Sequence, residues 1–243
     1  MPTIVPIALT LLSGGFNLQT ILIVLLVMSI SLSFHEYMHG YVAYRLGDDT
    51  ASLAGRLTMN PLAHLDPIGT LMFFLLGIGY AKPVPINPAR FTRGKSMKFG
   101  IMLTSLAGPA ANLLLAIVAV FLFYGTVTVA EAAALQVDNP VLRIFLNLFE
   151  FLYQSNIVLM VFNLLPIPPL DGSKVFSYLL PNELYYKFLS LQRYSGIILM
   201  LVFIFGRNII STVLTYIRIP FDYIIMTPIA ALFQTLWRLL GFV

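Results

Sequence analysis

The chain has 243 residues, of which 59% are hydrophobic and only 10% are charged. Soluble domains carry about 25% charged residues, so this composition excludes a water-soluble globular protein and predicts a chain that crosses the membrane several times. There is no cysteine, which excludes disulfide bonds, thiolate ligands and a thiolate nucleophile. The net charge of +4 comes without a basic arm interleaved with aromatic residues, so we expect no nucleic-acid partner.

Five apolar runs approach the roughly 20 residues that a membrane-spanning helix needs. They cover about residues 18–45, 99–124, 141–165, 194–205 (reaching 214 if two polar residues are tolerated) and 219–240, the last of which either spans or lies in the interface. Two shorter apolar pieces, 4–12 and 69–79, are expected to be re-entrant, interfacial or strand-like. The sequence therefore predicts an all-α polytopic membrane protein, a bundle of about five to six transmembrane helices with short re-entrant or strand-like segments.

We expect these helices to form one domain over residues 1–243, with a core at about 18–180 and C-terminal helices at about 194–243. The charges of the connections predict its orientation. The connection 45–98 carries half of the 14 basic residues, whereas 125–140 carries two acidic residues and no basic one. By the positive-inside rule, 45–98 and the basic segment after the third helix are cytoplasmic. The first helix then enters the cytoplasm after His39.

The pattern H-E-x-x-H lies within Ser33–Gly40 (SFHEYMHG), at the end of the first apolar run. Residues four apart face the same side of a helix, so His35 and His39 can bind one metal ion, with Glu36 beside it as a general base. The alternative is a pair of histidines packed and hydrogen-bonded inside a bundle. Ionisable groups within a spanning segment are costly and point to function, so we favour the metal site.

A catalytic zinc needs a third protein ligand and an open position for water. The best candidate is Asp171, in Asn163–Gly172 (NLLPIPPLDG). The prolines of this segment prevent a regular helix, so the chain is expected to unwind where the third helix reaches the cytoplasmic side, which places the carboxylate at the depth of the histidines. The alternative is a turn in which Asp171 caps the following helix.

In combination, H-E-x-x-H and the later N-x-x-P-x-x-x-L-D-G resemble the site-2 protease family of intramembrane zinc metalloproteases. Three further stretches are similar to segments of that family: Asn60–Gly69 (NPLAHLDPIG), Ala81–Pro88 (AKPVPINP) and Gly108–Asn112 (GPAAN). The resemblance covers about residues 20–180. The PDZ and CBS domains of some relatives have no counterpart here, so the chain resembles a minimal member.

The resemblance implies a zinc endopeptidase that cuts transmembrane or membrane-proximal segments of other membrane proteins. It implies that the two histidines and Asp171 hold one zinc ion, and that Glu36 takes a proton from the zinc-activated water and passes it to the leaving amine. It also implies that Asn112 and Asn163 stand near the site, to orient the substrate backbone or stabilise the oxyanion. The alternative for these amides is hydrogen bonding between membrane helices.

We therefore expect a multi-pass integral protein of the cell membrane with its active site toward the cytoplasm. Its expected partners are a transmembrane protein substrate and the lipid bilayer, and a regulatory membrane protein or a second copy of the chain stays open. His64 is expected to shape the loop over the site through a hydrogen bond rather than to bind metal. The proline-rich segment 82–88 is expected to be extended and to pair with an unwound substrate strand.

Two other classes of function compete with this hypothesis: a membrane transporter, and a non-proteolytic scaffold that binds membrane proteins. A transporter also places polar side chains in a bundle core, but it has no specific need for the base Glu36 beside two ligands four residues apart.

Overall fold

The structure is a computed structural model that describes residues 18–67, 69, 81–94, 96–136, 138–197, 201 and 207–241. This part of the chain is largely helical and has no strand; a single antiparallel β-bridge joins Leu65 and Ala81. Its elements are, in chain order, α2 (Leu18–Arg45), α3 (Thr50–Leu53), α4 (Pro61–His64), η1 (Pro88–Arg90), α6 (Met97–Ala132), α7 (Pro140–Asn163), α8 (Asp171–Tyr178), α9 (Asn182–Ser190), η2 (Leu191–Tyr194), α11 (Arg207–Phe221), the π-helical turn η3 (Asp222–Met226) and α12 (Thr227–Leu240).

Four helices of the described part are long and apolar enough to cross a membrane: α2, α6, α7 and the continuous stretch Thr215–Leu240. The predicted all-α polytopic fold is therefore confirmed, and helices lie at three of the expected spans, although α6 is longer than predicted, at 36 residues. The run expected at 219–240 is also helical and long enough to cross the membrane, but whether it spans or lies in the interface stays a prediction. The helix expected at 194–205 lies mostly outside the described residues, as do 4–12 and most of 69–79. The full count of five to six spans stays a prediction.

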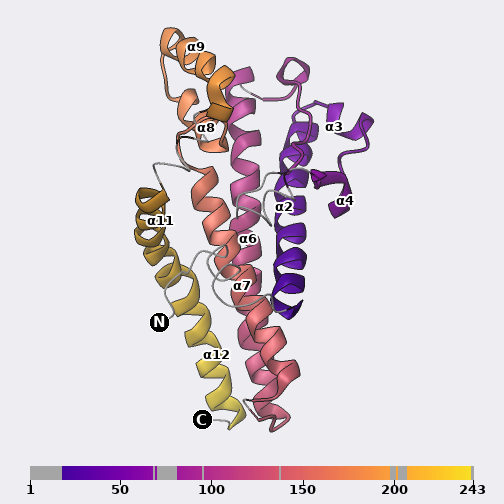
Figure 1. The fold of residues 1–243 in the computed structure, drawn as a ribbon, viewed down its shortest axis with the longest axis vertical. Coiled ribbons are helices and arrows are strands. Elements are labelled where there is room, and N and C mark those ends of the chain that lie inside the picture. Colours follow the sequence, from indigo (N-terminus) through magenta and orange to yellow (C-terminus); the bar gives the residue numbers. More distant parts are fainter. Residues whose placement is uncertain are drawn as a thin grey trace.

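Helices α2, α6 and α7 pack side by side and form the core of the bundle (Figure 1). The middle helix, α6, brings small side chains to the contact, among them the fully buried Ala116 and Ala119. Val27 of α2 and Ile157 of α7 pack into the same cluster and are also fully buried. Small side chains let helix backbones approach closely inside a membrane, which explains how α6 lies against both neighbours.

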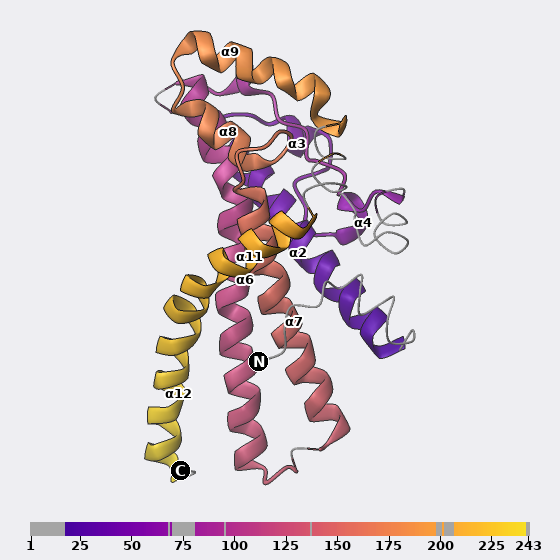
Figure 2. The same cartoon turned by 60° about the vertical axis from the view of Figure 1, so that its left-hand side comes forward.

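One end of the bundle carries the C-terminus of α2, the N-terminus of α6, and the short helices α3, α4, α8 and α9, whereas the α6–α7 turn lies at the other end (Figures 1 and 2). Lys98, at the start of α6, connects α6 to the turn after α8, because its Nζ donates to the Leu180 carbonyl at 2.8 Å. The described parts of the connection 45–98 and the segment after α7 thus share one end of the molecule, as the charge distribution predicts.

Helices α11 and α12 run along one side of α6 and α7 (Figure 2). The hydroxyl of Tyr153 on α7 donates to Asp222 Oδ1 at 2.6 Å, and Arg218 Nε lies 3.1 Å from Asp222 Oδ2. At the far end, Trp237 Nε1 donates to Thr128 Oγ1 of α6 at 2.7 Å. These bonds satisfy polar groups within an apolar bundle and hold the C-terminal helices against the core.

Candidate metal centre

Two histidines of α2 converge with one aspartate of α8. The Nε2 atoms of His35 and His39 are 3.0 Å apart, and Asp171 Oδ2 lies 3.2 Å from His35 Nε2 and 3.1 Å from His39 Nε2. All three residues are buried, with exposed fractions of 6%, 6% and 8%. The fold therefore brings together the three side chains that the sequence suggested as ligands, and their ligand atoms lie close enough to share one metal ion.

One face of α6 shapes this cluster through residues spaced four apart: Thr104, Gly108 and Asn112. His39 Nδ1 donates to the Thr104 carbonyl at 2.7 Å, and His35 Nδ1 donates to Asn112 Oδ1 at 2.6 Å. Between these contacts, a Cβ built on Gly108 would collide with Nε2 of His39 and lie only 2.6 Å from Nε2 of His35. A residue without a side chain is therefore required at 108 for the two rings to fit.

The hydrogen bonds at both Nδ1 atoms leave both Nε2 atoms unprotonated when the rings are neutral. Two lone pairs and a carboxylate oxygen then face one another at 3.0–3.2 Å, an arrangement that is stabilised by a proton or by a metal ion among them. In a tetrahedral zinc site with bonds of about 2.0–2.1 Å, ligand atoms lie about 3.3 Å apart. The donor set and its dimensions therefore fit zinc.

Asp171 reaches the cluster because the chain breaks between two helices. α7 ends at Asn163, and the proline-rich stretch 164–170 turns before α8 begins. A Cβ on Gly172 would collide with the carbonyl of Leu164, so glycine lets this stretch pack against the first turn of α8. The N-cap residue of α8 is Leu170, and no side chain makes a capping hydrogen bond there. Asp171 is the first residue of the helix, so the N-cap role considered for it is wrong.

The charge state of Asp171 suits a ligand. Burial by itself raises the pKa of this carboxyl, but in the metal-free protein attraction to a protonated His39, the contacts with both imidazoles, and Lys174 lower it more, so the pKa lies well below its usual range. The Lys174 ammonium is 3.6 Å from Asp171 Oδ1, on the oxygen that does not face the histidines. Asp171 is therefore ionised and can share its other oxygen with a cation.

Glu36 is half-buried and is held by a backbone group. Its Oε2 accepts a hydrogen bond from the Val84 N–H at 2.9 Å. Pro83 and Pro85, on either side of Val84, have no N–H to offer. Gly40, one turn along α2 from Glu36, allows the close approach of this segment, since a Cβ there would lie 3.1 Å from Val84 Cγ1. The segment 81–87 thus runs directly past the predicted base.

Several polar contacts fasten the segment 81–87 to the rest of the molecule. The Asn87 N–H donates to Oδ2 of the fully buried Asp48 at 2.6 Å. Arg56 Nη2 donates to the Lys82 carbonyl at 2.7 Å, and the Lys82 N–H donates to the His64 carbonyl at 2.8 Å. These bonds anchor the two ends of the segment and leave Val84 between them, over Glu36.

His64 is buried in the loop and lies outside the metal cluster. Its Nε2 donates to the Thr58 carbonyl at 2.8 Å, while its own carbonyl accepts from Lys82. Both bonds hold the loop that carries the segment 81–87, which is the kind of contact expected for this histidine from the sequence.

The two asparagines expected near the site differ in position. Asn112 lies against His35, and its Nδ2 donates to Asn156 Oδ1 at 3.1 Å. Asn163 lies at the end of α7, where its Nδ2 donates to the Leu159 carbonyl at 3.0 Å. Their role toward substrate stays a prediction, and contact of Asn112 with substrate would require its fully buried side chain to become exposed. Sequence reasoning missed Asn156; its only signal was a polar amide inside an apolar span.

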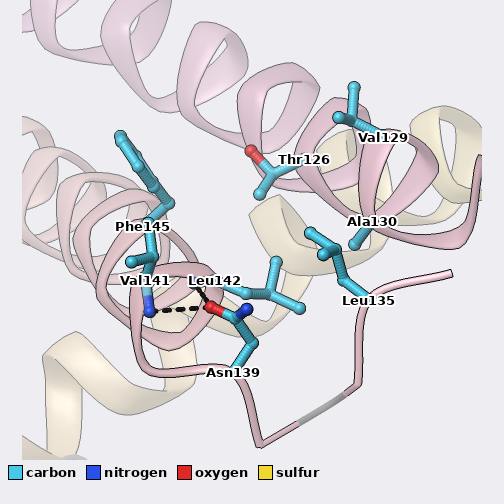
Figure 3. Close-up of a pocket in the computed structure, with 8 residues that line it drawn as sticks. All are labelled: Thr126, Val129, Ala130, Leu135, Asn139, Val141, Leu142 and Phe145. Carbon is cyan, nitrogen blue, oxygen red and sulfur yellow. Dashed lines mark hydrogen bonds between the residues drawn. The ribbon is translucent and has the colours of Figure 1, made fainter. Parts of the chain in front are cut away.

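A separate pocket lies where α6 turns into α7 (Figure 3). It has a volume of about 300 Å³ and is lined mainly by apolar side chains. Of its two polar side chains, Asn139 caps α7 by accepting from the N–H groups of Val141 and Leu142, and Thr126 donates to the Leu122 carbonyl. The pocket lies about 30 Å along α6 from Gly108 at 1.5 Å per residue and has no group suited to the chemistry of the histidine cluster.

Comparison with known proteins agrees with this geometry. The family model described as "Peptidase family M50" matches residues 23–205. The chain is 38% identical over 193 residues to "Putative zinc metalloprotease YwhC" of Bacillus subtilis (strain 168), covering 77% of this chain and 82% of that protein. It is 33% identical over 147 residues to "Putative zinc metalloprotease Rip2" of Mycolicibacterium smegmatis (strain ATCC 700084 / mc(2)155), covering 58% of this chain and 51% of that protein. No solved structure matches the chain significantly.

Proposed function

Because the chain belongs to peptidase family M50 and is a zinc metalloprotease of the membrane, we propose that it cuts transmembrane or membrane-proximal segments of other membrane proteins. The observation that carries this proposal is the convergence of His35, His39 and Asp171 inside a bundle of apolar helices, with Glu36 beside them. The proposal treats residues 1–243 as one protease domain.

The depth of the cluster supports cleavage within the membrane. His35 lies ten residues before Arg45, the last residue of α2, which is about 15 Å along the helix. The hydrocarbon core of a bilayer is about 30 Å thick, so a site this far from the helix end can lie below the membrane surface. A substrate peptide bond at that depth belongs to a membrane segment, which must unwind locally because a helix engages its own carbonyls.

In this proposal His35, His39 and Asp171 hold one zinc ion and leave a fourth position open for water. When bound, zinc supplies Lewis acidity that lowers the pKa of water and polarises the scissile carbonyl. The two imidazoles contribute neutral Nε2 donors, and Asp171 contributes one negative charge. The Thr104 carbonyl and Asn112 Oδ1 keep the rings in place by accepting hydrogen bonds from their Nδ1–H groups.

Glu36 carries the proton. Its carboxylate accepts a proton from water as the water oxygen bonds to the scissile carbonyl carbon, and the same proton passes to the amide nitrogen as the C–N bond breaks. The products are one carboxyl and one amino terminus. The hydrogen bond from the Val84 N–H occupies Oε2 of Glu36, so Oε1 is the oxygen that we expect to face the water.

The extended segment 81–87 is the proposed guide for substrate. It lies beside Glu36, and an unwound substrate strand could pair with it by β-augmentation. The positive-inside rule, applied to the basic connection at this end of the bundle, favours a cytoplasmic opening of the site in the cell membrane. Products would then leave toward the cytoplasm.

Glu36→Gln tests the proposal, because it keeps the shape of the side chain and removes the base. Membranes that contain wild-type or Glu36→Gln protein are compared by proteomics for a membrane-protein fragment that changes. We expect the fragment to disappear in Glu36→Gln while bound zinc remains. The matched control is Glu150→Gln on α7, because Glu150 is an exposed carboxylate that accepts a hydrogen bond from Gln154. We expect this variant to produce the same fragment as wild type.

Full processing by Glu36→Gln would refute the proteolytic mechanism. The transporter and scaffold hypotheses predict no fragment in either case, together with transport or binding that survives the substitution.

A further inference from the structure

A chain of buried hydrogen bonds runs from His35 across α6 and α7 and back to α2. Asn112 Oδ1 accepts from His35 Nδ1 at 2.6 Å, and Asn112 Nδ2 donates to Asn156 Oδ1 at 3.1 Å. Asn156 Nδ2 donates to the Leu152 carbonyl and to Ser31 Oγ, each at 2.8 Å. Asn112, Asn156 and Ser31 have exposed fractions of 0%. Bulk water therefore does not reach them, and each polar atom depends on its partner in the chain.

The Leu152 carbonyl fixes the direction of these bonds. A carbonyl oxygen only accepts, so Asn156 must present its amide nitrogen to Leu152 and its Oδ1 to Asn112. Asn112 must then present its nitrogen to Asn156 and its Oδ1 to His35. An oxygen that faces His35 Nδ1 requires a proton on that nitrogen, which leaves His35 Nε2 unprotonated and able to bind a metal.

We propose that Asn156 is a positioning residue for metal binding, which acts through Asn112 to hold His35 in the tautomer protonated on Nδ1. Ser31 supports it by accepting a hydrogen bond from Asn156 Nδ2. His39 needs no such relay, because its Nδ1 meets the Thr104 carbonyl directly. The inference rests on the proposed zinc site and adds to it a residue that touches neither metal nor substrate.

A purely structural role is the rival explanation, since asparagine also joins helices inside membranes. Both explanations predict lower stability when Asn156 is replaced. They differ in what happens to His35: only the positioning role predicts a change in its tautomer and in zinc affinity while the protein stays folded.

Asn156→Leu separates the two explanations because it keeps a similar volume and removes the acceptor for Asn112. Outer-shell partners of metal-binding histidines change metal affinity by about 10-fold to 100-fold, and for this more distant partner we expect about 10-fold, measured by chelator competition on the full chain in detergent. The chain has 3 histidines, so ¹⁵N-histidine spectra of the zinc-free protein can be assigned. We expect the His35 signal to shift from the Nδ1–H form toward the Nε2–H form.

Asn156→Asp is the conservative variant that should restore zinc binding. In its protonated form the introduced carboxyl group donates to the Leu152 carbonyl and accepts from Asn112, so the direction of the bonds is restored and we expect near-wild-type zinc affinity. If Asn156→Leu does not fold, Asn156→Ser makes the same test, because its hydroxyl is too short to reach Asn112.

Ile157→Ala is the matched control for stability, since Ile157 is the next residue of α7, is fully buried and lies in the apolar core. We expect it to lower the thermal midpoint and to keep zinc affinity within about twofold of wild type, because it leaves the hydrogen-bond chain intact. The inference is overturned if Asn156→Leu keeps the wild-type tautomer and zinc affinity, or if Ile157→Ala weakens zinc binding equally. Wild-type zinc affinity in His35→Ala would instead overturn the proposed zinc site itself.

Discussion

Gly108→Ala tests the close packing of α6 against the histidine pair. A Cβ at this position would collide with His39 Nε2 and lie 2.6 Å from His35 Nε2, whereas ordinary contacts begin at 3.4 Å. His35 Nε2 would have to retreat by the difference, 0.8 Å. His39 Nε2 would have to move further. Both atoms are proposed zinc ligands, so the substitution acts on the metal directly.

The size of the effect follows from this displacement. Catalytic and metal-binding side chains tolerate displacements of about 0.5 Å, and a displacement of about 1 Å can lower the rate about 100-fold. A 100-fold loss corresponds to about 2.7 kcal/mol of transition-state stabilisation. We therefore expect Gly108→Ala to lower kcat/KM at least about 100-fold and to bind less zinc, while the helix itself is favoured by alanine.

Gly125→Ala is the matched control, because Gly125 lies in the same helix and a Cβ there meets nothing within 4 Å. Both variants are reconstituted in vesicles, and zinc per chain and cleavage of a transmembrane substrate are measured. We expect Gly125→Ala to match wild type in both. The reasoning is refuted if Gly108→Ala retains wild-type zinc content and cleavage.

Three further predictions concern the parts that support the site. Asp48→Ala should lower the free energy of unfolding by about 3 kcal/mol and expose the segment 81–87 to added protease, because Asn87 loses a buried charged partner; unchanged protease resistance would contradict this. Gly172→Ala should weaken zinc binding by moving the start of α8 away from the Leu164 carbonyl, and unaltered affinity in chelator competition would count against it. Chelation of zinc should lower the thermal midpoint, and added zinc but not magnesium should restore it, since imidazole ligands favour zinc; a midpoint indifferent to the chelator would show that no ion holds the cluster together.

The sequence was sufficient to predict the spans and the cluster, because each depends on a simple pattern. Apolar runs of sufficient length predict α2, α6 and α7. The four-residue spacing of His35 and His39 predicts a shared face. The prolines before Asp171 predict a break in the helix at matching depth. Each of these features is encoded within one short segment of the chain.

Contacts made by backbone groups could not be predicted in this way. The Thr104 carbonyl that accepts a hydrogen bond from His39 and the Val84 N–H that donates one to Glu36 are backbone groups, which any residue type except proline as a donor can supply. Asn156 was not predicted because its hydrogen bonds to Asn112 and Ser31 depend on three helices meeting at one depth. Gly108 was noticed only as part of a family-like motif, and its reason, contact with both imidazoles, required the packing of α6 against α2.

The central claim is that this chain cleaves membrane segments with the zinc centre formed by His35, His39 and Asp171. The most direct measurement reconstitutes purified zinc-loaded protein in vesicles with a labelled transmembrane substrate and determines the fragment masses. We predict new termini within or next to the apolar segment of the substrate, lost in both Glu36→Gln and Asp171→Asn, with zinc lost only in the latter. Fragments that persist in Glu36→Gln, or a cut confined to a distant soluble part of the substrate, would contradict the account.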